Sequence, residues 1–370
     1  MTTRFVVSFA GRSKWTSILG AVLSTATVFG SIGLGLGQTP QYIVAELTGD
    51  DATQVPSKLN NLRDIVGRKA GNGEGAPRAT LWGHSRSSAK HLGVLADGDY
   101  SSATGINDAG EIVGVSNTGR AILPFIWTEK GGLRRLPLLP GDSCGQAVAI
   151  NKYGHVVCYS SGPSGSRAFL WTRKTGLRSL GGLPGGNHSR AHDINDFDEV
   201  AGVSTGSEGE HAVLWTKSGG VRDLGTLPGD SSSEAMAINN AGDVVGYSKG
   251  PREMRAFVWT KAGGMEELGI LPGGSSSRAL DINDSGVVVG NSTSSSGDHA
   301  FVWQKQTGML DLNETGSAAL GILLVEAHAI NGQGEILAMG RMTHGAMESQ
   351  GQLCAPAPPL SFLLTPIASP

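Results

Sequence analysis

Short apolar runs alternate with turn-forming residues along most of this chain. One unit follows the pattern A-x-x-I-N-x-x-G-x-V-V-G-x-S, then a variable loop, then A-F-x-W-T, and then K-x-G-G-M-x-x-L-G-x-L-P-G-G. Ile, Val, Phe and Trp are enriched in the apolar runs, which favours β-strands, and no run is long enough for a helix. The pattern therefore predicts an all-β fold.

The residues between the apolar runs predict how the strands are joined. Asn-Asp-Ala-Gly at 107–110 is typical of a tight hairpin, because Asn and Asp bond to the local backbone and Gly accepts a positive φ. Lys-Ala-Gly-Gly at 261–264 predicts a second hairpin between the third and fourth strands. The longer Leu-Pro-Gly-Gly segments are the better connections between units. We name the four strands of a unit a, b, c and d.

The unit recurs with a fixed period. The Asn that ends strand a recurs every 44 residues at Asn107, Asn151, Asn195, Asn239 and Asn283. Successive Trp residues of strand c are 45, 44, 44, 44 and 44 residues apart, at Trp82, Trp127, Trp171, Trp215, Trp259 and Trp303. Four strands in about 44 residues are the content of one β-propeller blade. A residue present in every copy is expected to serve the fold, so only departures from the repeat point to a specific site.

Seven copies of strand a can be counted. They start near Pro56, Ala103, Ala147, Ala191, Ala235, Ala279 and Ala327. The last unit has a strand c at 361–365, with Leu364 in the Trp position, but no strand d after it. Residues 42–47 match strand d and have no unit before them. We therefore predict a seven-bladed β-propeller whose N-terminal strand completes the last blade, which removes two exposed sheet edges.

The first 40 residues differ from the repeats. Arg4, Arg12 and Lys14 precede a stretch from 15 to 37 that has no charged residue. This order is typical of an export signal, and a retained N-terminal membrane anchor is the alternative. The predicted organisation is an export signal or anchor at 1–40, a propeller of seven repeats at 41–367 and a tail at 368–370. The protein is accordingly expected to be extracellular, periplasmic or attached to the cell surface.

Charge and cysteine content add little to this picture. Charged residues make up 16% of the chain, the net charge is −3 and no basic stripe stands out, so nucleic acid is not an expected partner. Cys144 and Cys158 replace Ser and Gly of the other copies, which makes a disulfide between them a hypothesis in an exported chain. Two small buried thiols are the alternative. Cys354, in a Pro-rich segment, is expected to be unpaired.

The densest carboxylate cluster is a candidate metal site. Asp193, Asp196 and Asp198 resemble the start of a calcium-binding loop, which needs a bidentate Glu at position twelve, where this chain has Ser204. A structural turn is therefore the favoured interpretation, and a weak surface calcium site is the other; no other cofactor is predicted. His188 and His192 have the spacing of a metal pair on a helix, but the local pattern is a loop followed by a strand.

Three further motifs are interpreted as structural. Ser204 and Ser248 lie in G-x-S-x-G, but a Ser recurs there in successive units, so a hydrolase nucleophile is disfavoured. The Trp set is expected to pack between blades, with a sugar-stacking ladder as the alternative. Cationic residues begin several copies of strand c, and we expect them to pair with acids rather than to form a ligand-binding ring. The cationic residues are His211, Arg255 and His299, and the acids are Asp223, Glu267 and Asp311.

The repeats resemble the HAF-repeat family, which are predicted extracellular bacterial repeat proteins. The runs His-Ala-Phe-Val-Trp at 299–303 and His-Ala-Val-Leu-Trp at 211–215 resemble its defining motif, and Leu-Gly-Thr-Leu at 224–227 resembles another. The resemblance covers residues 42–367, and Arg78, Arg167 and Arg255 replace the His of the motif. It implies export and a β-rich repeat fold. It implies no established activity, substrate or catalytic residue.

Function follows only in outline. We predict an exported, non-catalytic monomer with a binding or structural role, whose partner is an envelope protein or a polysaccharide. The alternative is a polysaccharide-acting enzyme with its site in the propeller channel. An enzyme should bring unlike acids, His and Arg from several blades to one channel mouth, whereas the copies read as near-equal in blades three to six. Any partner is expected on the face with the b–c loops, which vary most: 162–166, 205–210, 250–254 and 294–298.

Overall fold

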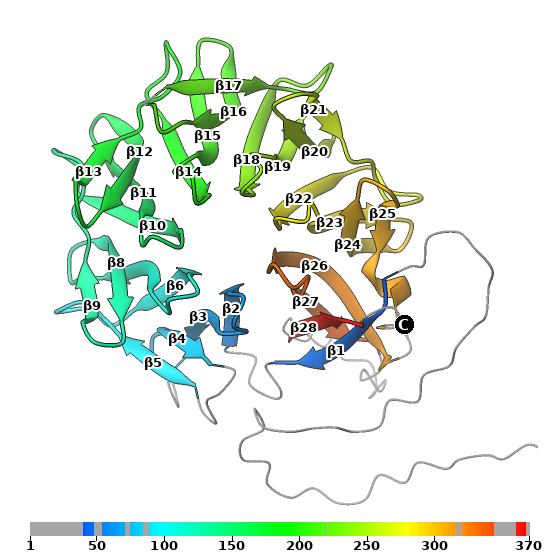
Figure 1. Cartoon of the computed structure of the whole chain (residues 1–370), viewed down its shortest axis with the longest axis horizontal. Helices are drawn as coiled ribbons and strands as arrows, with labels where there is room; N and C mark the ends of the chain where they lie inside the picture. Colours follow the sequence, from blue (N-terminus) through cyan, green and yellow to red (C-terminus); the bar gives the residue numbers. More distant parts are fainter. Residues whose placement is uncertain are drawn as a thin grey trace, which may run out of the picture.

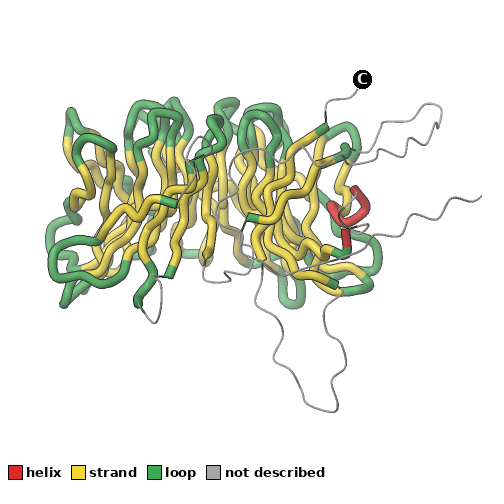
Figure 2. The backbone as a smooth tube through the Cα atoms, turned by 90° about the horizontal axis from the view of Figure 1, so that it is seen from below, coloured by secondary structure: helices red, strands yellow, loops and turns green. Residues whose placement is uncertain are grey.

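The computed structural model describes residues 40–47, 54–70, 75–83, 89–218, 220–315, 317, 320–343 and 360–367. Seven four-stranded antiparallel sheets are arranged as blades around a central channel (Figure 1). The side view in Figure 2 shows a short cylinder with turns and loops at both ends. The fold is therefore the predicted seven-bladed β-propeller. The predicted export signal, the tail and Cys354 lie outside the described residues, within which no helix is long and apolar enough to cross a membrane.

Blades 1 to 6 each contain strands a to d in chain order, with strand a innermost (Figure 1). Blade 1 consists of β2 (Gln54–Leu59), β3 (Ile65–Lys69), β4 (Arg78–Trp82) and β5 (Lys90–Gly93). Blade 2 consists of β6 (Ser101–Ile106), β7 (Ile112–Asn117), β8 (Ile122–Thr128) and β9 (Gly132–Arg135). Blade 3 consists of β10 (Cys144–Ile150), β11 (Val156–Gly162), β12 (Gly165–Thr172) and β13 (Gly176–Ser179). Blade 4 consists of β14 (Ser189–Ile194), β15 (Val200–Gly206), β16 (Gly209–Trp215) and β17 (Val221–Gly225). Blade 5 consists of β18 (Ser232–Ile238), β19 (Val244–Lys249), β20 (Met254–Thr260) and β21 (Gly264–Glu267). Blade 6 consists of β22 (Ser277–Ile282), β23 (Val288–Ser294), β24 (Gly297–Gln304) and β25 (Gly308–Asp311), followed by the 3-10 helix η1 (Leu312–Thr315).

Blade 7 confirms the predicted ring closure. It consists of β26 (Ile322–Ile330), β27 (Ile336–Met342), β28 (Leu360–Pro366) and the N-terminal β1 (Tyr42–Glu46) as its outermost strand. In the register of β1 and β28, Val44 lies opposite Leu364. Leu364 in turn lies opposite Ile336, just as Trp215 lies opposite Val200 in blade 4, and it is fully buried. The two ends of the propeller are therefore held together by one sheet.

The repeated aromatic residues fill the spaces between blades. Trp215, 1% exposed, packs with Val213 of its own blade and with Leu170 and Leu180 of blade 3. Each of the other inter-blade clusters has the same composition of inner-strand Ala, Ile and Val with strand-c aromatics. The packing interpretation of the Trp set is therefore confirmed. Burying a side chain of this size contributes a few kcal/mol to the stability of the fold. The sequence period therefore reflects the repeated hydrophobic clusters between neighbouring blades.

A closed ring of hydrogen bonds explains the repeated Asn. In every blade the Nδ2 of this buried Asn donates to the backbone oxygen of its counterpart in the next blade. The distances are between 3.0 and 3.3 Å, and Asn331 of blade 7 donates to Asn60 of blade 1. The Oδ1 of each Asn accepts backbone N–H groups of its own a–b turn, as Asn195 does from Phe197 and Glu199. One residue type thus shapes the turn and joins neighbouring blades.

The disulfide hypothesis is not supported. Cys144 and Cys158 are both free thiols. In the pairing of β10 with β11, Cys144 lies opposite Ser161, whereas Cys158 lies opposite Ala147, so the two residues are offset along the strands. A disulfide requires Cα atoms within about 7 Å, which this offset does not allow. Cys158 is instead fully buried among blade 2 and 3 side chains, and burial raises the pKa of its thiol well above the ordinary value.

Candidate functional site

The central channel contains the residues that differ most between blades. Its wall is formed by strand a of every blade and encloses a cavity of about 490 Å³. The motif A-x-x-I-N leaves two positions free in each copy, and in blades 3 to 6 they contain Val148 and Ala149, His192 and Asp193, Met236 and Ala237, and Leu280 and Asp281. The residue before the Ala is Gln146, Arg190, Glu234 or Arg278 in the same blades. The expectation of near-equal copies is therefore wrong at the channel wall.

The channel has two chemically distinct ends. Strand a starts at the face with the b–c loops and ends at the a–b turns, as the pairing of β14 with β15 shows. A second cavity of about 300 Å³ opens at the a–b face and is lined by the Asn ring and by Asp108, Asp196 and Asp284. Both cavities are bordered by aliphatic residues that end strand a, including Ile106, Ile150 and Ile330. These residues mark the boundary between the two cavities.

A part-buried ion pair between blades 1 and 6 lies near this boundary. Nζ of Lys58, from blade 1, donates to Oδ2 of Asp281, from blade 6, at 2.7 Å. Asp281 is 4% exposed and also accepts the backbone N–H groups of Ile282 and Ile330. Because blade 7 lies between blades 1 and 6, this pair passes in front of blade 7 and joins two blades that are not neighbours, and it forms a polar floor to the cavity on the b–c face.

The floor contains three titratable groups with shifted pKa values. Burial acts to lower the pKa of Lys58, but the charges of Asp281 and Asp193 raise it, so the ammonium stays protonated. Burial, together with the like charge of Asp281, raises the pKa of Asp193 to about 6 against the opposing effect of Lys58. Burial and the charge of Lys58 lower the pKa of His328 to about 4. At neutral pH these three groups are therefore an ammonium at Lys58, a carboxylate at Asp193 and a neutral imidazole at His328.

A second polar network lies closer to the b–c face. Oε1 of Glu234 lies 2.7 Å from Nε2 of His192, which belongs to the neighbouring blade. The hydroxyl of Tyr247 donates to the other oxygen of Glu234. Burial acts to raise the pKa of Glu234, but these two contacts outweigh it and lower the pKa to about 2. Glu234 is thus an ion that orients an imidazole and a phenol.

The aspartates proposed as a calcium site point to different partners. Asp193 faces the channel and accepts the backbone N–H of Ile238 from the next blade at 3.0 Å. Asp196 accepts backbone and side-chain donors of Lys152 and a side-chain donor of Asn240. Asp198 adopts a positive φ of 62° in the a–b turn, where most copies have Gly, and its carboxylate contacts His155 at 2.6 Å. The described residues contain no group of three ligands suited to a metal ion.

Other residues singled out in the sequence serve the scaffold. His188 and His192 do not converge, because Nδ1 of His188 accepts the backbone N–H of Ser166 while His192 contacts Glu234 in the channel. Ser204 is 1% exposed, and its Oγ accepts the N–H of Leu183 and donates to the carbonyl of His188. It therefore fixes the crossing between blades. It does not lie in a strand-to-helix turn.

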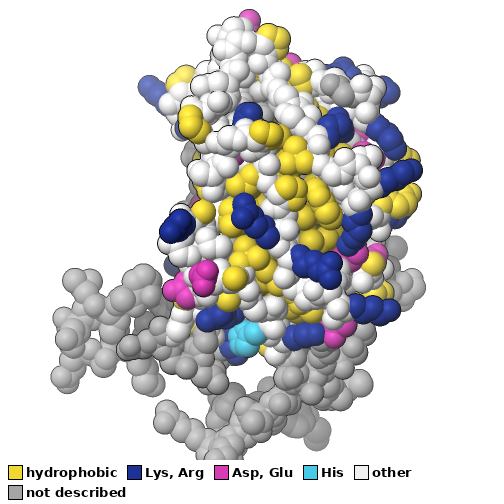
Figure 3. All heavy atoms as spheres, turned by 90° about the vertical axis from the view of Figure 1, so that its left-hand side faces the viewer, with side chains coloured by type: hydrophobic (Ala, Val, Ile, Leu, Met, Phe, Trp, Pro, Cys, Tyr) yellow, Lys and Arg dark blue, Asp and Glu magenta, His cyan; other side chains and the backbone are white. Residues whose placement is uncertain are grey.

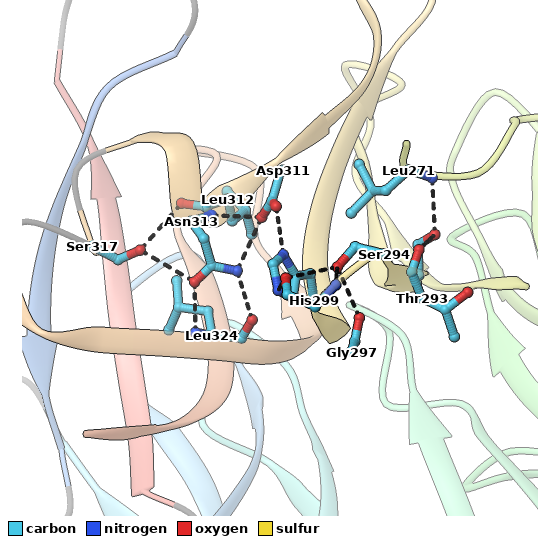
Figure 4. A network of polar contacts seen from close by, with 12 residues as sticks. Leu271, Thr293, Ser294, Gly297, His299, Asp311, Leu312, Asn313, Ser317 and Leu324 are labelled. Atoms are coloured by element: carbon cyan, nitrogen blue, oxygen red, sulfur yellow. Dashed lines mark hydrogen bonds and ion pairs between the residues drawn. The ribbon is translucent and has the colours of Figure 1, made fainter. Parts of the chain in front are cut away.

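The predicted pairs of cationic and acidic residues are present at the outer edge of the blades. His211 lies 2.9 Å from Asp223, Arg255 lies 2.9 Å from Glu267, and His299 lies 2.5 Å from Asp311. Figure 4 shows the pair in blade 6, where Asp311 also accepts hydrogen bonds from Asn313. Asn313 bonds in turn to both backbone groups of Leu324, which opens strand a of blade 7. These pairs hold the outer strands and the last crossing in place.

Basic side chains gather on the outer surface of blades 2 and 3. Figure 3 shows this side of the ring, with Lys and Arg spread over apolar surface. The exposed basic residues on the outer edge of these two blades include Lys130, Arg134, Arg135, Arg173 and Lys174. They belong to strand d or to the turn before it, and each strand d has a free edge. Basic residues at such an edge oppose pairing with other chains, so we assign them to solubility.

Sequence reasoning missed the channel residues. Lys58, Glu234, Arg278 and His328 come from four different blades, and each looks like an unremarkable surface residue of a strand. The available signal was variation at the free positions of A-x-x-I-N, and at the residue before its Ala, inside an otherwise regular repeat. The prediction of a partner at the b–c loops did not use this variation.

Comparison with known proteins supports the fold and goes no further. No family model and no curated protein matches the chain. Virginiamycin B lyase from Staphylococcus aureus superposes with a TM-score of 0.52 and 12% identity over 89% of this chain and 100% of that one. Oligogalacturonate lyase in complex with manganese gives 0.51 and 12% over 84% and 88%. Puromycin hydrolase gives 0.50 and 11% over 80% of this chain and 52% of that one. At such identities the similarity establishes the β-propeller fold alone.

Proposed function

We propose that this protein is an exported binding protein of the bacterial envelope or extracellular space, with its ligand site in the channel at the b–c face. One observation carries the proposal: unlike side chains are concentrated on the channel wall of a ring that is otherwise nearly repetitive. Fold stability needs the repeated Asn, Ser and Trp residues, but it does not need Gln146, His192 and Arg278 to differ from one another. A cavity of about 490 Å³ is within the range of small-molecule sites.

Export and family membership belong to the same proposal. The basic residues before position 15 and the uncharged stretch from 15 to 37 support an export signal or an anchor. The repeated His-Ala-Phe and Leu-Gly-x-Leu motifs support membership of the HAF-repeat family. A partner that meets this protein outside the cytoplasm is an envelope polysaccharide or an envelope protein segment, and the polar wall suits the end of either chain.

Two matched Trp substitutions in blade 5 test the position of the site. Met236→Trp places a Trp side chain on the channel wall, whereas Ala262→Trp places one in an exposed c–d turn. The purified parent and both variants are applied to a glycan array and to envelope extracts, after their melting temperatures have been compared. We expect a ligand that binds the parent and Ala262→Trp but not Met236→Trp. A ligand that binds all three equally would place the site outside the channel.

A second candidate function is an enzyme acting on a polysaccharide in the same channel. It is favoured by the unlike acids, His and Arg that several blades bring to one channel, as expected of an enzyme, and by the contact of His192 with ionised Glu234, because a carboxylate beside an imidazole is a common arrangement for a general base. If the chain cleaves any glycan that it binds, His192→Ala should lower kcat by about 10²-fold or more. Binding without turnover in the parent, with every glycan that binds, would leave the non-catalytic proposal as the better one.

A further inference from the structure

We propose that the b–c end of the channel recognises a single carboxylate group next to a hydroxyl, as in a sugar acid, with Arg278 as the anchoring residue. This inference rests on the proposed function and names the chemistry of its ligand. The starting point is the position of Arg278 on β22. Its neighbours Ser277 and Ala279 are buried in the blade, and Arg278 lines the channel cavity.

Arg278 has no anionic partner among the described residues. No ion pair or hydrogen bond joins its guanidinium to another described side chain, and its Nε is buried without an acceptor. The Nε of Arg167 is also buried without an acceptor, but Arg167 is paired with Asp142 at 2.7 Å, and Arg255 is paired with Asp230 at 2.9 Å, whereas Arg278 has no such ion pair. A buried donor of a charged group is costly to leave unpaired, so this one calls for an explanation.

The guanidinium is nevertheless held in one place. It lies 5.2 Å from the ring centroid of Tyr247, in a cation–π contact with blade 5. The Tyr247 hydroxyl is bonded to Glu234, and Glu234 contacts His192. This chain of contacts runs across three blades and fixes the stacking face. The Arg fork is therefore preorganised, which lowers the entropic cost of binding a planar anion.

A hydrogen-bond acceptor for a ligand hydroxyl lies beside the Arg278 guanidinium. Asn291 is directly opposite Arg278 in the antiparallel pair of β22 and β23, so the two side chains are on the same face of the blade. Its Oδ1 is buried and accepts no hydrogen bond from the described residues. A carboxylate on Arg278 with a hydroxyl two carbons from it, as at C4 of a uronic acid, would satisfy both atoms. The Arg fork matches the planar carboxylate geometry in a bidentate manner.

The charge around the fork selects a monoanion. Glu234 is ionised, and Glu326 of blade 7 lines the same cavity and interacts electrostatically with Arg278. Arg190, the other arginine at this level, already faces Glu210 at 3.9 Å. Because acids already flank the guanidinium, a phosphate dianion would be repelled more strongly than a carboxylate, which carries a single negative charge. The chemistry on this surface therefore favours a carboxylate over a phosphate.

Side-chain NMR of the full-length protein labelled with ¹⁵N-arginine tests this directly. The Nε–Hε signal of Arg278 is assigned by its loss in Arg278→Lys, after the melting temperature of that variant has been measured. The parent is titrated at constant ionic strength with sodium glucuronate, glucuronamide, glucose or inorganic phosphate. These three sugars differ only at C6. We expect a saturable shift of the Arg278 signal with glucuronate alone, and the same shift in the matched control Arg190→Lys.

Affinity measurements complete the test. Arg278→Gln should weaken glucuronate binding by about 10- to 100-fold, the effect of losing a charge-assisted bidentate bond. No saturable response to glucuronate, or an equal response to glucose or phosphate, would overturn the inference. A ligand blocked by Met236→Trp but indifferent to Arg278→Gln would overturn it while leaving the proposed function intact. Glucuronate binding at Arg278 in a protein that binds no envelope ligand would support this inference and contradict the proposed function.

Discussion

The Asn ring offers the sharpest test of how this fold is stabilised. We choose Asn195→Ala, because Asn195 is 4% exposed and all its polar contacts are defined. Its Nδ2 donates to the carbonyl of Asn239 in the next blade at 3.1 Å and to Oε2 of Glu199 at 2.8 Å. Its Oδ1 accepts the N–H groups of Phe197 and Glu199, both at 3.0 Å. Truncation to Ala removes all four bonds.

The magnitude follows from where the lost partners lie. The two turn N–H groups are near the surface, where water can replace part of the lost bonds. The carbonyl of Asn239 is buried between blades and loses its donor, which costs about 1–3 kcal/mol by itself. We therefore expect the free energy of unfolding to fall by about 2–4 kcal/mol. Asn195→Asp keeps the two acceptor contacts but turns a carboxylate toward Glu199 and the Asn239 carbonyl. It should destabilise at least as much at pH 7.

The matched control is Asn240→Ala, which removes the same residue type from the neighbouring position of the turn in blade 5. Asn240 is half-buried, and its side chain bonds to Asp196 and Asp284 at the channel mouth, where water competes. Its loss should cost about 1 kcal/mol or less. Urea unfolding followed by Trp fluorescence measures all variants, with equal m-values as the check on two-state behaviour. Equal effects of Asn195→Ala and Asn240→Ala would refute the ring as a distinct source of stability.

Four further outcomes are expected. Trp215→Ala should lower stability by about 3–5 kcal/mol in thermal or urea unfolding, because it empties a core between blades; an unchanged melting temperature with loss of sugar binding would restore the ladder interpretation. Deleting residues 42–47 should lower the melting temperature and cause self-association in light scattering, because β28 becomes an open edge; a monodisperse variant of parental stability would contradict closure. Ser204→Ala should leave any hydrolytic activity unchanged in a rate assay, and a loss of activity would contradict its structural role. Asp193 has a pKa of about 6 in the folded state against an ordinary 3.8, so the folded state binds its proton more tightly and the stability contributed by this group is lost as pH rises from about 4 to about 7. The free energy of unfolding of the parent should therefore fall across that window relative to Asp193→Asn. Parallel pH profiles of the two proteins would contradict the raised pKa.

Much of the fold was predictable because each blade repeats the same local rules. The spacing of Trp and Asn gave the period, the turn residues gave the order of strands, and the unmatched strand at 42–47 gave the closure. The acid partners of His211 and His299 were predictable as well, because the residues lie on paired strands c and d of one blade. Short-range geometry is largely determined by sequence separation, so these features did not require a structure.

The candidate site was not predictable by that route. Lys58 contacts Asp281, which is more than half the chain away, and Arg278 stacks on Tyr247 of another blade. Such contacts depend on closing seven blades into a ring, which decides which strand-a side chains face one another across the lumen. Cys144 and Cys158, in contrast, are kept apart by the register of β10 and β11 within one blade, and Asp193 and Asp196 by the end of strand a between them. The sequence by itself determined the blade and the number of blades, because hydrogen bonding and burial within a repeat are local. Only the tertiary structure decided the chemistry of the channel, because there the distance between residues is determined by the ring and not by the chain.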